Sequence, residues 1–174
     1  MADNYLEFSE VIPQLASDEA AWLDDQLRSI AVIDAVVYRL DEVPDELDAQ
    51  KATYRGPKFL LNAKHIDIWG DEPDFSFAFQ QDQHNGHRSR QLWIYSDSYG
   101  CLDQVAVLVQ KFLRKFRPDD IWTIGYAATC SKPRVGEFGG GVVIVTPKGV
   151  RWLDSGAIAA KAIAAHERRR SVAA

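Results

Sequence analysis

The sequence predicts a single α+β domain whose mainly antiparallel sheet is flanked by about three helices. Three observations lead to this prediction. Short β-branched and apolar runs alternate with segments in which apolar residues recur at helical spacing. An Asn85–Gly86 pair marks a tight hairpin, which joins two antiparallel strands. The 174 residues contain neither an internal repeat nor a low-complexity linker, so one core is expected to serve the whole length.

The first predicted element is a helix that begins at Ser17. The hydroxyl of Ser17 can cap free backbone N–H groups, and the two acidic residues that follow suit the positive end of the helix dipole. The apolar positions that then recur at helical spacing are Ala20, Leu23, Leu27 and Ile30.

Between this helix and the hairpin, the pattern favours extended chain. The β-branched run at 31–40 predicts a strand, and the polar segment 41–56 predicts a connection that holds one helical turn. Residues 59–69 also look extended. Their apolar positions change from odd to even numbers, which indicates a bulge or break near Lys64.

The hairpin is the clearest local feature. Its turn at Asn85–Gly86 sets a register that places apolar residues opposite apolar residues. The pairs expected are His84 with His87, Phe79 with Leu92, Phe77 with Ile94, Ala78 with Trp93, and Ser76 with Tyr95. The outer half is wholly polar, so the tip at about 82–90 is expected to project into solvent.

The second half of the chain predicts two further helices and several strands. An apolar stripe from Asp103 predicts a helix that Pro118 ends. A last helix is expected from Ser155, followed by a flexible charged tail at about 167–174. The strands are expected at 121–128, 142–146 and 150–153.

Composition excludes several classes of function. A net charge of −5 gives no overall attraction to nucleic acid or to an anionic membrane. No run approaches the length of a membrane-spanning helix, and the first residues lack the basic and apolar regions of a signal peptide. Two cysteines do not make a disulfide framework. The sequence therefore predicts a cytoplasmic protein with reduced thiols.

The segment 129–141 is the most distinctive in the chain. It joins two predicted strands and combines positive charge with consecutive glycines. The residues that could bind a ligand here are Lys132, Arg134, Gly139, Gly140 and Gly141. Successive glycine N–H groups can form an anion-binding nest, which the two cations would strengthen. The segment matches no standard nucleotide fingerprint, so no cofactor is predicted.

The same segment allows two other interpretations. In an enzyme, Cys130 would be the nucleophile or Glu137 the general base, with Arg134 and the glycine N–H groups as an anion clamp. The arginine stands four residues after Cys130, which does not fit the C-x5-R spacing of cysteine phosphatases. In a purely structural interpretation, the glycines are needed for a β-bulge or for close backbone packing at the crowded start of a strand, and Glu137 pairs with Arg134.

The hairpin tip supplies a second candidate surface. His84 and His87 flank the turn, but the H-x-x-H spacing alone is weak evidence for a metal, and no paired cysteines supplement it. No metal is therefore predicted. His84, His87 and Arg88 are instead candidate residues for contact with a partner.

Part of the chain resembles a family of uncharacterised bacterial proteins. The segments that carry this resemblance are Leu92–Gly100, Val105–Pro118, Thr129–Gly141 and Val142–Thr146. The match spans about 60 residues, roughly Leu92 to Asp154, and the glycine-rich element is the most distinctive part of it. The resemblance brings no activity, cofactor or catalytic residue with it.

The leading hypothesis from the sequence is a binding or regulatory module without catalytic activity. Its partner would be a protein or a small anion held at the 129–141 segment. The enzyme and the purely structural interpretation remain alternatives, and the sequence leaves the oligomeric state open.

Overall fold

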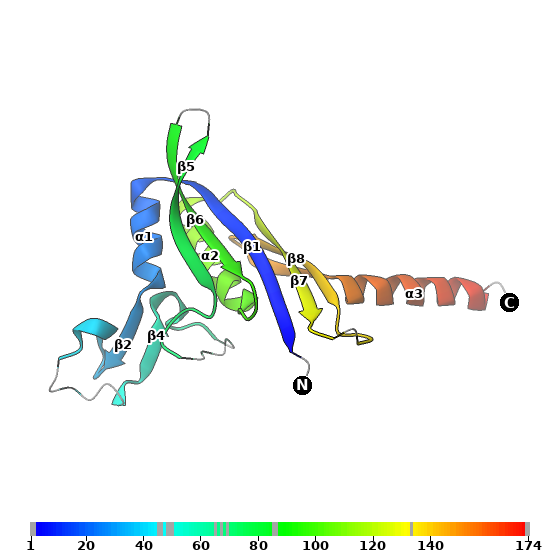
Figure 1. Cartoon of the computed structure of the whole chain (residues 1–174), viewed down its shortest axis with the longest axis horizontal. Coiled ribbons are helices and arrows are strands. Elements are labelled where there is room, and N and C mark those ends of the chain that lie inside the picture. Colours follow the sequence, from blue (N-terminus) through cyan, green and yellow to red (C-terminus); the bar gives the residue numbers. More distant parts are fainter. Residues whose placement is uncertain are drawn as a thin grey trace.

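A six-stranded antiparallel sheet forms the centre of the molecule (Figure 1). A computed structural model describes residues 3–172 except 45, 46, 48–50, 65, 67, 69, 85, 86 and 133, and the side chains of 82–88, 167 and 170–172 are also outside the description. The strand order is β5–β6–β1–β7–β8–β9. The strands are β1 (Asn4–Leu15), β5 (Ser76–His84), β6 (His87–Ser96), β7 (Trp122–Cys130), β8 (Gly139–Thr146) and β9 (Gly149–Asp154).

Strand β1 lies between β6 and β7, although the sequence analysis assigned no element before Ser17. Phe8 pairs with Ser96 on one side and with Tyr126 on the other. Its side chain is buried, as is that of Ile12, so alternate positions of β1 face the core. This alternation is interrupted by Glu10 and by an irregularity between Ile12 and Leu15, which weakens the strand signal in the sequence.

The hairpin formed by β5 and β6 has the predicted register. All five predicted pairs are present, from Ser76 opposite Tyr95 to His84 opposite His87. Asn85 and Gly86 themselves lie outside the described residues. Leu92 and Ile94 are fully buried, which confirms that the apolar alternation sets the register.

Helix α2 (Leu102–Phe116) packs on the inner face of this sheet, as predicted. Its buried stripe supplies much of the core, with Val105, Leu108, Val109 and Phe112 fully inaccessible to solvent. The helix ends two residues before Pro118, which cannot continue the backbone hydrogen bonding.

Helix α1 (Ser17–Leu27) is shorter than predicted and is capped differently. The carboxylate of Glu19, rather than the hydroxyl of Ser17, accepts a hydrogen bond at this end, from the N–H of Ala16 at 2.9 Å. Ile30 is buried in the next strand and not in the helix, because the backbone becomes extended directly after Leu27.

A small sheet follows, with strand order β3–β2–β4, and it corrects the predicted strand at 31–40. That run is a hairpin of β2 (Ser29–Ile33) and β3 (Val36–Arg39). Asp34 and Ala35 form its two-residue turn with φ of 49° and 65°. Alanine is rare in this left-handed conformation, so the sequence carries little turn signal.

The extended segment predicted at 59–69 is wrong at its start, while residues 65, 67 and 69 lie outside the described part of the chain. Strand β4 (Tyr54–Pro57) leads into a 3-10 turn at Lys58–Leu60, and Asn62 then adopts a φ of 66°. The change from odd to even apolar positions reflects this turn, because Phe59 and Leu60 are buried before the backbone changes direction. A further 3-10 turn at Leu40–Glu42 matches the helical turn expected in the 41–56 connection.

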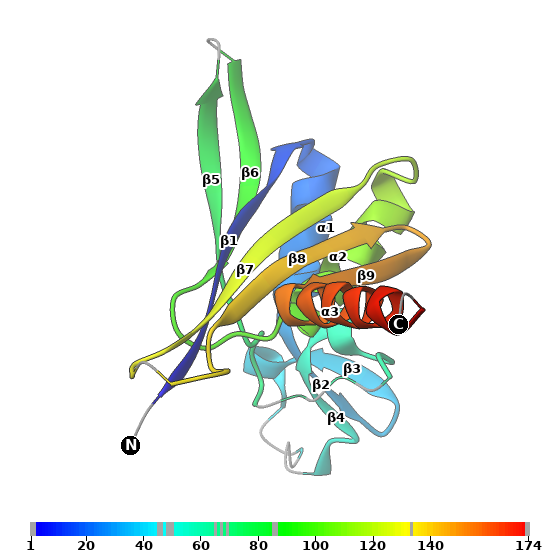
Figure 2. The same cartoon turned by 90° about the vertical axis from the view of Figure 1, so that its right-hand side faces the viewer.

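Helix α3 (Ser155–Val172) projects away from the rest of the chain (Figures 1 and 2). It therefore includes most of the segment expected as a tail at about 167–174. Figure 2 shows α1 and α2 behind the large sheet and α3 in front of it. Among the described residues there are three α-helices and nine strands, which confirms a single α+β domain with a mainly antiparallel sheet. No helix in the described part of the chain is long and apolar enough to cross a membrane.

Candidate functional site

The connection between β7 and β8 is shorter than the sequence indicates. Gly139, Gly140 and Gly141 belong to β8, where they pair with Ala128, Ala127 and Tyr126 respectively. Because Thr129 and Cys130 end β7, the loop itself comprises residues 131–138. We refer to residues 131–138 as the β7–β8 loop.

Close backbone packing explains two of the three glycines. A Cβ atom on Gly140 would lie 2.5 Å from the carbonyl oxygen of Tyr126. A Cβ atom on Gly141 would overlap the carbonyl oxygen of Leu153 in β9. At Gly139 the nearest atom is Ser155 Oγ at 3.7 Å, an ordinary contact distance. The crowded strand entry considered in the structural interpretation therefore accounts for Gly140 and Gly141.

The base of the β7–β8 loop is tied to β1. The N–H of Ser131 donates to the carbonyl of Asp3, and the hydroxyl of Ser131 accepts from the N–H of Asp3, each at 2.9 Å. Thr129 Oγ1 donates to Glu7 Oε1 at 3.0 Å. These bonds connect the start of the loop to the central strand of the sheet.

Glu137 braces the inside of the loop. The thiol of Cys130 donates to Glu137 Oε2 at 2.9 Å, and Arg134 Nη1 lies 3.5 Å from Glu137 Oε1. Cys130 is buried, and the hydrogen bond to Glu137 raises the pKa of its thiol, although the Lys132 N–H and Arg134 partly oppose this shift. The neutral thiol is a poor nucleophile, so this arrangement does not favour the catalytic interpretation of Cys130.

A hollow of about 650 Å³ lies beside the loop, between the ends of β1 and β7 and the start of α3. Of the five residues predicted to bind a ligand, Gly139 and Gly140 line this hollow, whereas Lys132, Arg134 and Gly141 do not. The charged groups that line it are the carboxylates of Glu137 and Asp154. Negative charge disfavours an anion, so this hollow gives the predicted anion site no support, and that site stays a prediction.

Asp154 already has hydrogen-bond donors. Its Oδ1 accepts from the N–H of Ala157 at 2.8 Å, which caps α3, and its Oδ2 lies 3.4 Å from the hydroxyl of Tyr126. The N-terminus of α3 is thus occupied by a side chain of the protein itself.

Two apolar side chains project from the β7–β8 loop. Val135 is fully exposed, with a relative accessibility of 105%, and Phe138 is 55% exposed. Lys132 and Arg134 are exposed on the same loop. Neither Val135 nor Phe138 was among the site residues predicted from the sequence, where the charges and glycines of this segment are the more distinctive features. The available signal was the presence of Val135 and Phe138 within an otherwise polar connection.

The strands that flank the hairpin tip pair as predicted, as far as His84 opposite His87, but the side chains of His84, His87 and Arg88 lie outside the description. Their assignment to partner contact stays a prediction. Arg90, the nearest described basic residue on β6, places its guanidinium 5.3 Å from the ring centre of Phe79.

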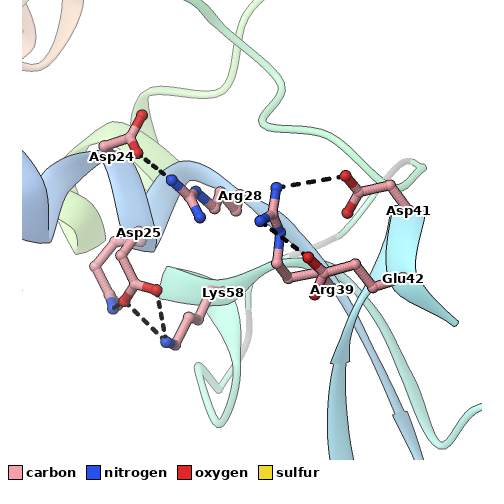
Figure 3. Close-up of polar contacts among 8 residues, drawn as sticks. Asp24, Asp25, Arg28, Arg39, Asp41, Glu42 and Lys58 are labelled. Atoms are coloured by element: carbon pink, nitrogen blue, oxygen red, sulfur yellow. Dashed lines mark hydrogen bonds and ion pairs between the residues drawn. The ribbon is translucent and has the colours of Figure 1, made fainter.

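A second hollow, of about 490 Å³, is lined by Arg28 and Arg39 near the small sheet. Arg28 pairs with Asp24 at 2.5 Å, and Arg39 lies 3.1 Å from Glu42 (Figure 3). The acidic residues that line this hollow are Asp41, Asp71 and Glu72. Acids thus outnumber the arginines, and half-exposed ion pairs of this kind contribute little energy. The β7–β8 loop therefore remains the better candidate site.

Comparison with protein-family models, with curated proteins and with solved structures finds no match for this chain. The resemblance to a family of uncharacterised bacterial proteins accordingly stays an expectation from the sequence.

Proposed function

We propose that this protein is a non-catalytic binding module that recognises a protein partner through the β7–β8 loop. One observation carries the proposal. Val135 and Phe138 are exposed on a loop whose shape is fixed by hydrogen bonds within the chain. An apolar side chain held in solvent by a braced loop contributes nothing to the core and is available for contact with another protein.

The energetic gain would come mainly from these two side chains. Complete burial of a valine or phenylalanine side chain is worth about 1.5–3 kcal/mol each. Because the loop is held in shape by its tie to Asp3 and by Glu137, little conformational entropy would be lost on binding. A small, preformed apolar contact of this kind is typical of the central residues of an interface.

The charges on the loop indicate the chemistry of the partner. Lys132 and Arg134 are exposed beside the apolar side chains, and although Arg134 pairs with Glu137, the loop keeps a net positive charge on a protein whose net charge is −5. The complementary surface would be an apolar pocket with an acidic rim. We also propose a cytoplasmic location, which is supported by Cys101 and Cys130 both being free thiols.

The alternatives are less well supported by the geometry. A small anion would meet Glu137 and Asp154 in the adjacent hollow. An enzyme that uses Cys130 would need a thiolate, whereas the carboxylate of Glu137 favours the neutral thiol. A purely structural role explains Gly140 and Gly141 but gives no reason for an exposed Val135.

Selection from a peptide-display library tests the proposal. The wild type would be immobilised, and each selected peptide would be tested against Val135→Ser/Phe138→Ser and against Ile121→Ser. Ile121 is a matched control, because its apolar side chain is 67% exposed. It lies directly before Trp122, the first residue of β7, at the end of the strand away from the β7–β8 loop. We expect the selected peptides to be rich in acidic and apolar residues, to lose binding to the loop variant and to keep binding to Ile121→Ser.

Two results would contradict the proposal. The first is a set of peptides that bind the loop variant as well as the wild type. The second is a thermal stabilisation by phosphate or carboxylate compounds that disappears in Lys132→Ala/Arg134→Ala, since this would identify a small-anion site instead.

A further inference from the structure

Helix α3 is almost entirely exposed. None of the side chains described between 155 and 169 is buried, and Ile158 and Ile163 are 56% and 60% exposed. Beyond its first turns, which adjoin β8 and β9, the helix extends away from the body of the protein (Figure 1). An exposed helix in a stable fold would normally carry polar residues on most of its surface.

The first eleven residues of α3 are instead mostly apolar, whereas residues 166–171 are polar or charged. The apolar positions of its first eleven residues are Ala157, Ile158, Ala159, Ala160, Ala162, Ile163, Ala164 and Ala165. At about 100° per residue, Ile158 and Ile163 point in directions roughly 140° apart, so the two large apolar side chains do not lie on one narrow stripe. A helical segment with so few polar side chains is usually buried. This composition therefore indicates that another surface covers α3.

Beyond the first turns of α3, which adjoin β8 and β9, the outer face of the large sheet is uncovered. Gly125 and Thr123 of β7 are exposed there, and Val142, which pairs with Gly125, is 36% exposed. On β6 the rings of Trp93 and Tyr95 stack on the same face at 3.9 Å. Helices α1 and α2 lie behind the sheet and leave this face open (Figure 2).

The dimensions of the two surfaces agree. A helix of 18 residues is about 27 Å long at about 1.5 Å per residue. Six strands spaced by about 4.8 Å give a sheet about 24 Å wide. The part of α3 beyond its first turns is therefore long enough to cover much of the outer face of one sheet.

Charge favours the body of a second copy as the cover of α3. Residues 155–174 carry four basic side chains and one acidic one, a net charge of +3. Since the whole chain has −5, residues 1–154 carry −8. Two α3 helices packed only on each other would bring like charges together, whereas α3 on the body of another copy brings opposite charges together.

We propose that two copies of this chain form a two-fold symmetric dimer in which α3 of each copy lies across the outer sheet face of the other. The arrangement is reciprocal, so it covers both exposed apolar surfaces of both copies at once and closes without free ends. The many alanines allow the helix backbone to approach the sheet closely, and Ile158 and Ile163 provide the larger contacts.

Sedimentation equilibrium of the full chain tests this dimer. We expect a mass of twice 19.6 kDa for the wild type, and a dimer that weakens as the salt concentration rises. Ile158→Gln/Ile163→Gln keeps helix-forming residues at both positions, and Val142→Lys places a like charge on the outer face. Each should weaken the dimer at least tenfold, whereas Ile121→Gln should leave it unchanged. Circular dichroism would verify that each variant is folded.

Mixing the two variants distinguishes this reciprocal dimer from other dimer arrangements. An equimolar mixture of Ile158→Gln/Ile163→Gln with Val142→Lys contains one intact helix and one intact sheet face, so a mixed dimer should form that neither variant forms alone. A wild-type monomer at about 100 µM would overturn the proposal, as would a helix-dependent dimer that Val142→Lys does not weaken. Binding of a wild-type monomer to anionic vesicles would likewise overturn it, because a membrane would then cover α3.

Discussion

The thiol of Cys130 lies 2.9 Å from Oε2 of Glu137, and this hydrogen bond joins the last residue of β7 to the approach of β8. The same carboxylate lies 3.5 Å from Arg134 through its other oxygen. Glu137 thus contacts both Cys130, which the sequence suggested as a nucleophile, and Arg134, which it suggested as an anion-binding residue. In the folded chain they hold the β7–β8 loop in the shape that exposes Val135 and Phe138.

The reactivity of Cys130 should report this hydrogen bond. Glu137→Gln removes the negative charge that raises the pKa of the Cys130 thiol, so the apparent pKa should fall and alkylation at neutral pH should become faster. Arg134→Ala removes a positive charge that lowers this pKa, so alkylation should become slower. The measurement is the pH dependence of iodoacetamide labelling, followed by mass spectrometry of the peptide that contains Cys130.

Cys101 provides an internal control for this experiment. Burial is the main cause that raises the pKa of its thiol, and no group of the β7–β8 loop contributes to that shift. Its labelling should therefore be the same in both variants. Equal apparent pKa values for Cys130 in the wild type and both variants would show that the bond to Glu137 is not formed in solution.

The glycines of β8 should differ sharply in their tolerance of alanine. Gly141→Ala would place a Cβ atom against the carbonyl oxygen of Leu153, and we expect the free energy of unfolding to fall by about 2 kcal/mol. Gly139→Ala is the matched control, because its Cβ atom would meet nothing closer than 3.7 Å. It should change stability by about 0.5 kcal/mol or less. Urea unfolding would measure both variants, and equal stability would refute the crowding argument.

The sequence predicted those parts of the fold in which a short-range pattern agrees with the packing. The Asn85–Gly86 turn set the register of β5 and β6, and the apolar stripe of α2 identified the helix that covers the sheet. Prediction from the sequence failed where the backbone adopts a conformation that the local residue types do not favour. Asp34 and Ala35 turn the chain with positive φ, and alanine at the second position gives no turn signal.

The candidate site was predicted in position but not in detail. Segment 129–141 does contain the loop, yet Gly140 and Gly141 are needed for strand packing, and Arg134 pairs with Glu137. Local sequence cannot show that the carbonyl of Leu153 approaches Gly141, because that contact depends on the register of β8 and β9. The exposure of Val135 likewise depends on the loop conformation.

A partly buried ion pair should contribute substantially to stability. Arg117 donates to both carboxylate oxygens of Glu19, at 2.8 and 2.9 Å, and the two side chains are only 20% and 11% exposed. Glu19→Gln leaves the guanidinium without its counter-charge, so the free energy of unfolding should fall by about 2 kcal/mol. Asp24→Asn is the matched control in the same helix, since the Asp24–Arg28 pair is about half exposed. Chemical denaturation of the two variants should therefore give clearly different losses.

The same pair predicts how stability depends on pH. The hydrogen bond from Arg117 lowers the pKa of Glu19 below its ordinary value. Because the folded-state pKa is the lower one, the stabilisation is complete above the unfolded-state pKa of about 4.3 and is lost as the pH falls through the folded-state pKa. The stability difference between the wild type and Glu19→Gln should thus be constant near neutral pH and shrink below about pH 4. A difference that does not change with pH would contradict this assignment.

The most direct test of the proposed binding function is the affinity of one selected peptide, measured by isothermal titration calorimetry. If the β7–β8 loop is the recognition element, Val135→Ser/Phe138→Ser should bind at least about thirtyfold more weakly than the wild type, a loss of about 2 kcal/mol. Ile121→Ser should bind with the wild-type affinity. Equal binding by the loop variant and the wild type would contradict the central claim, because the exposed side chains of the loop would then have no part in recognition.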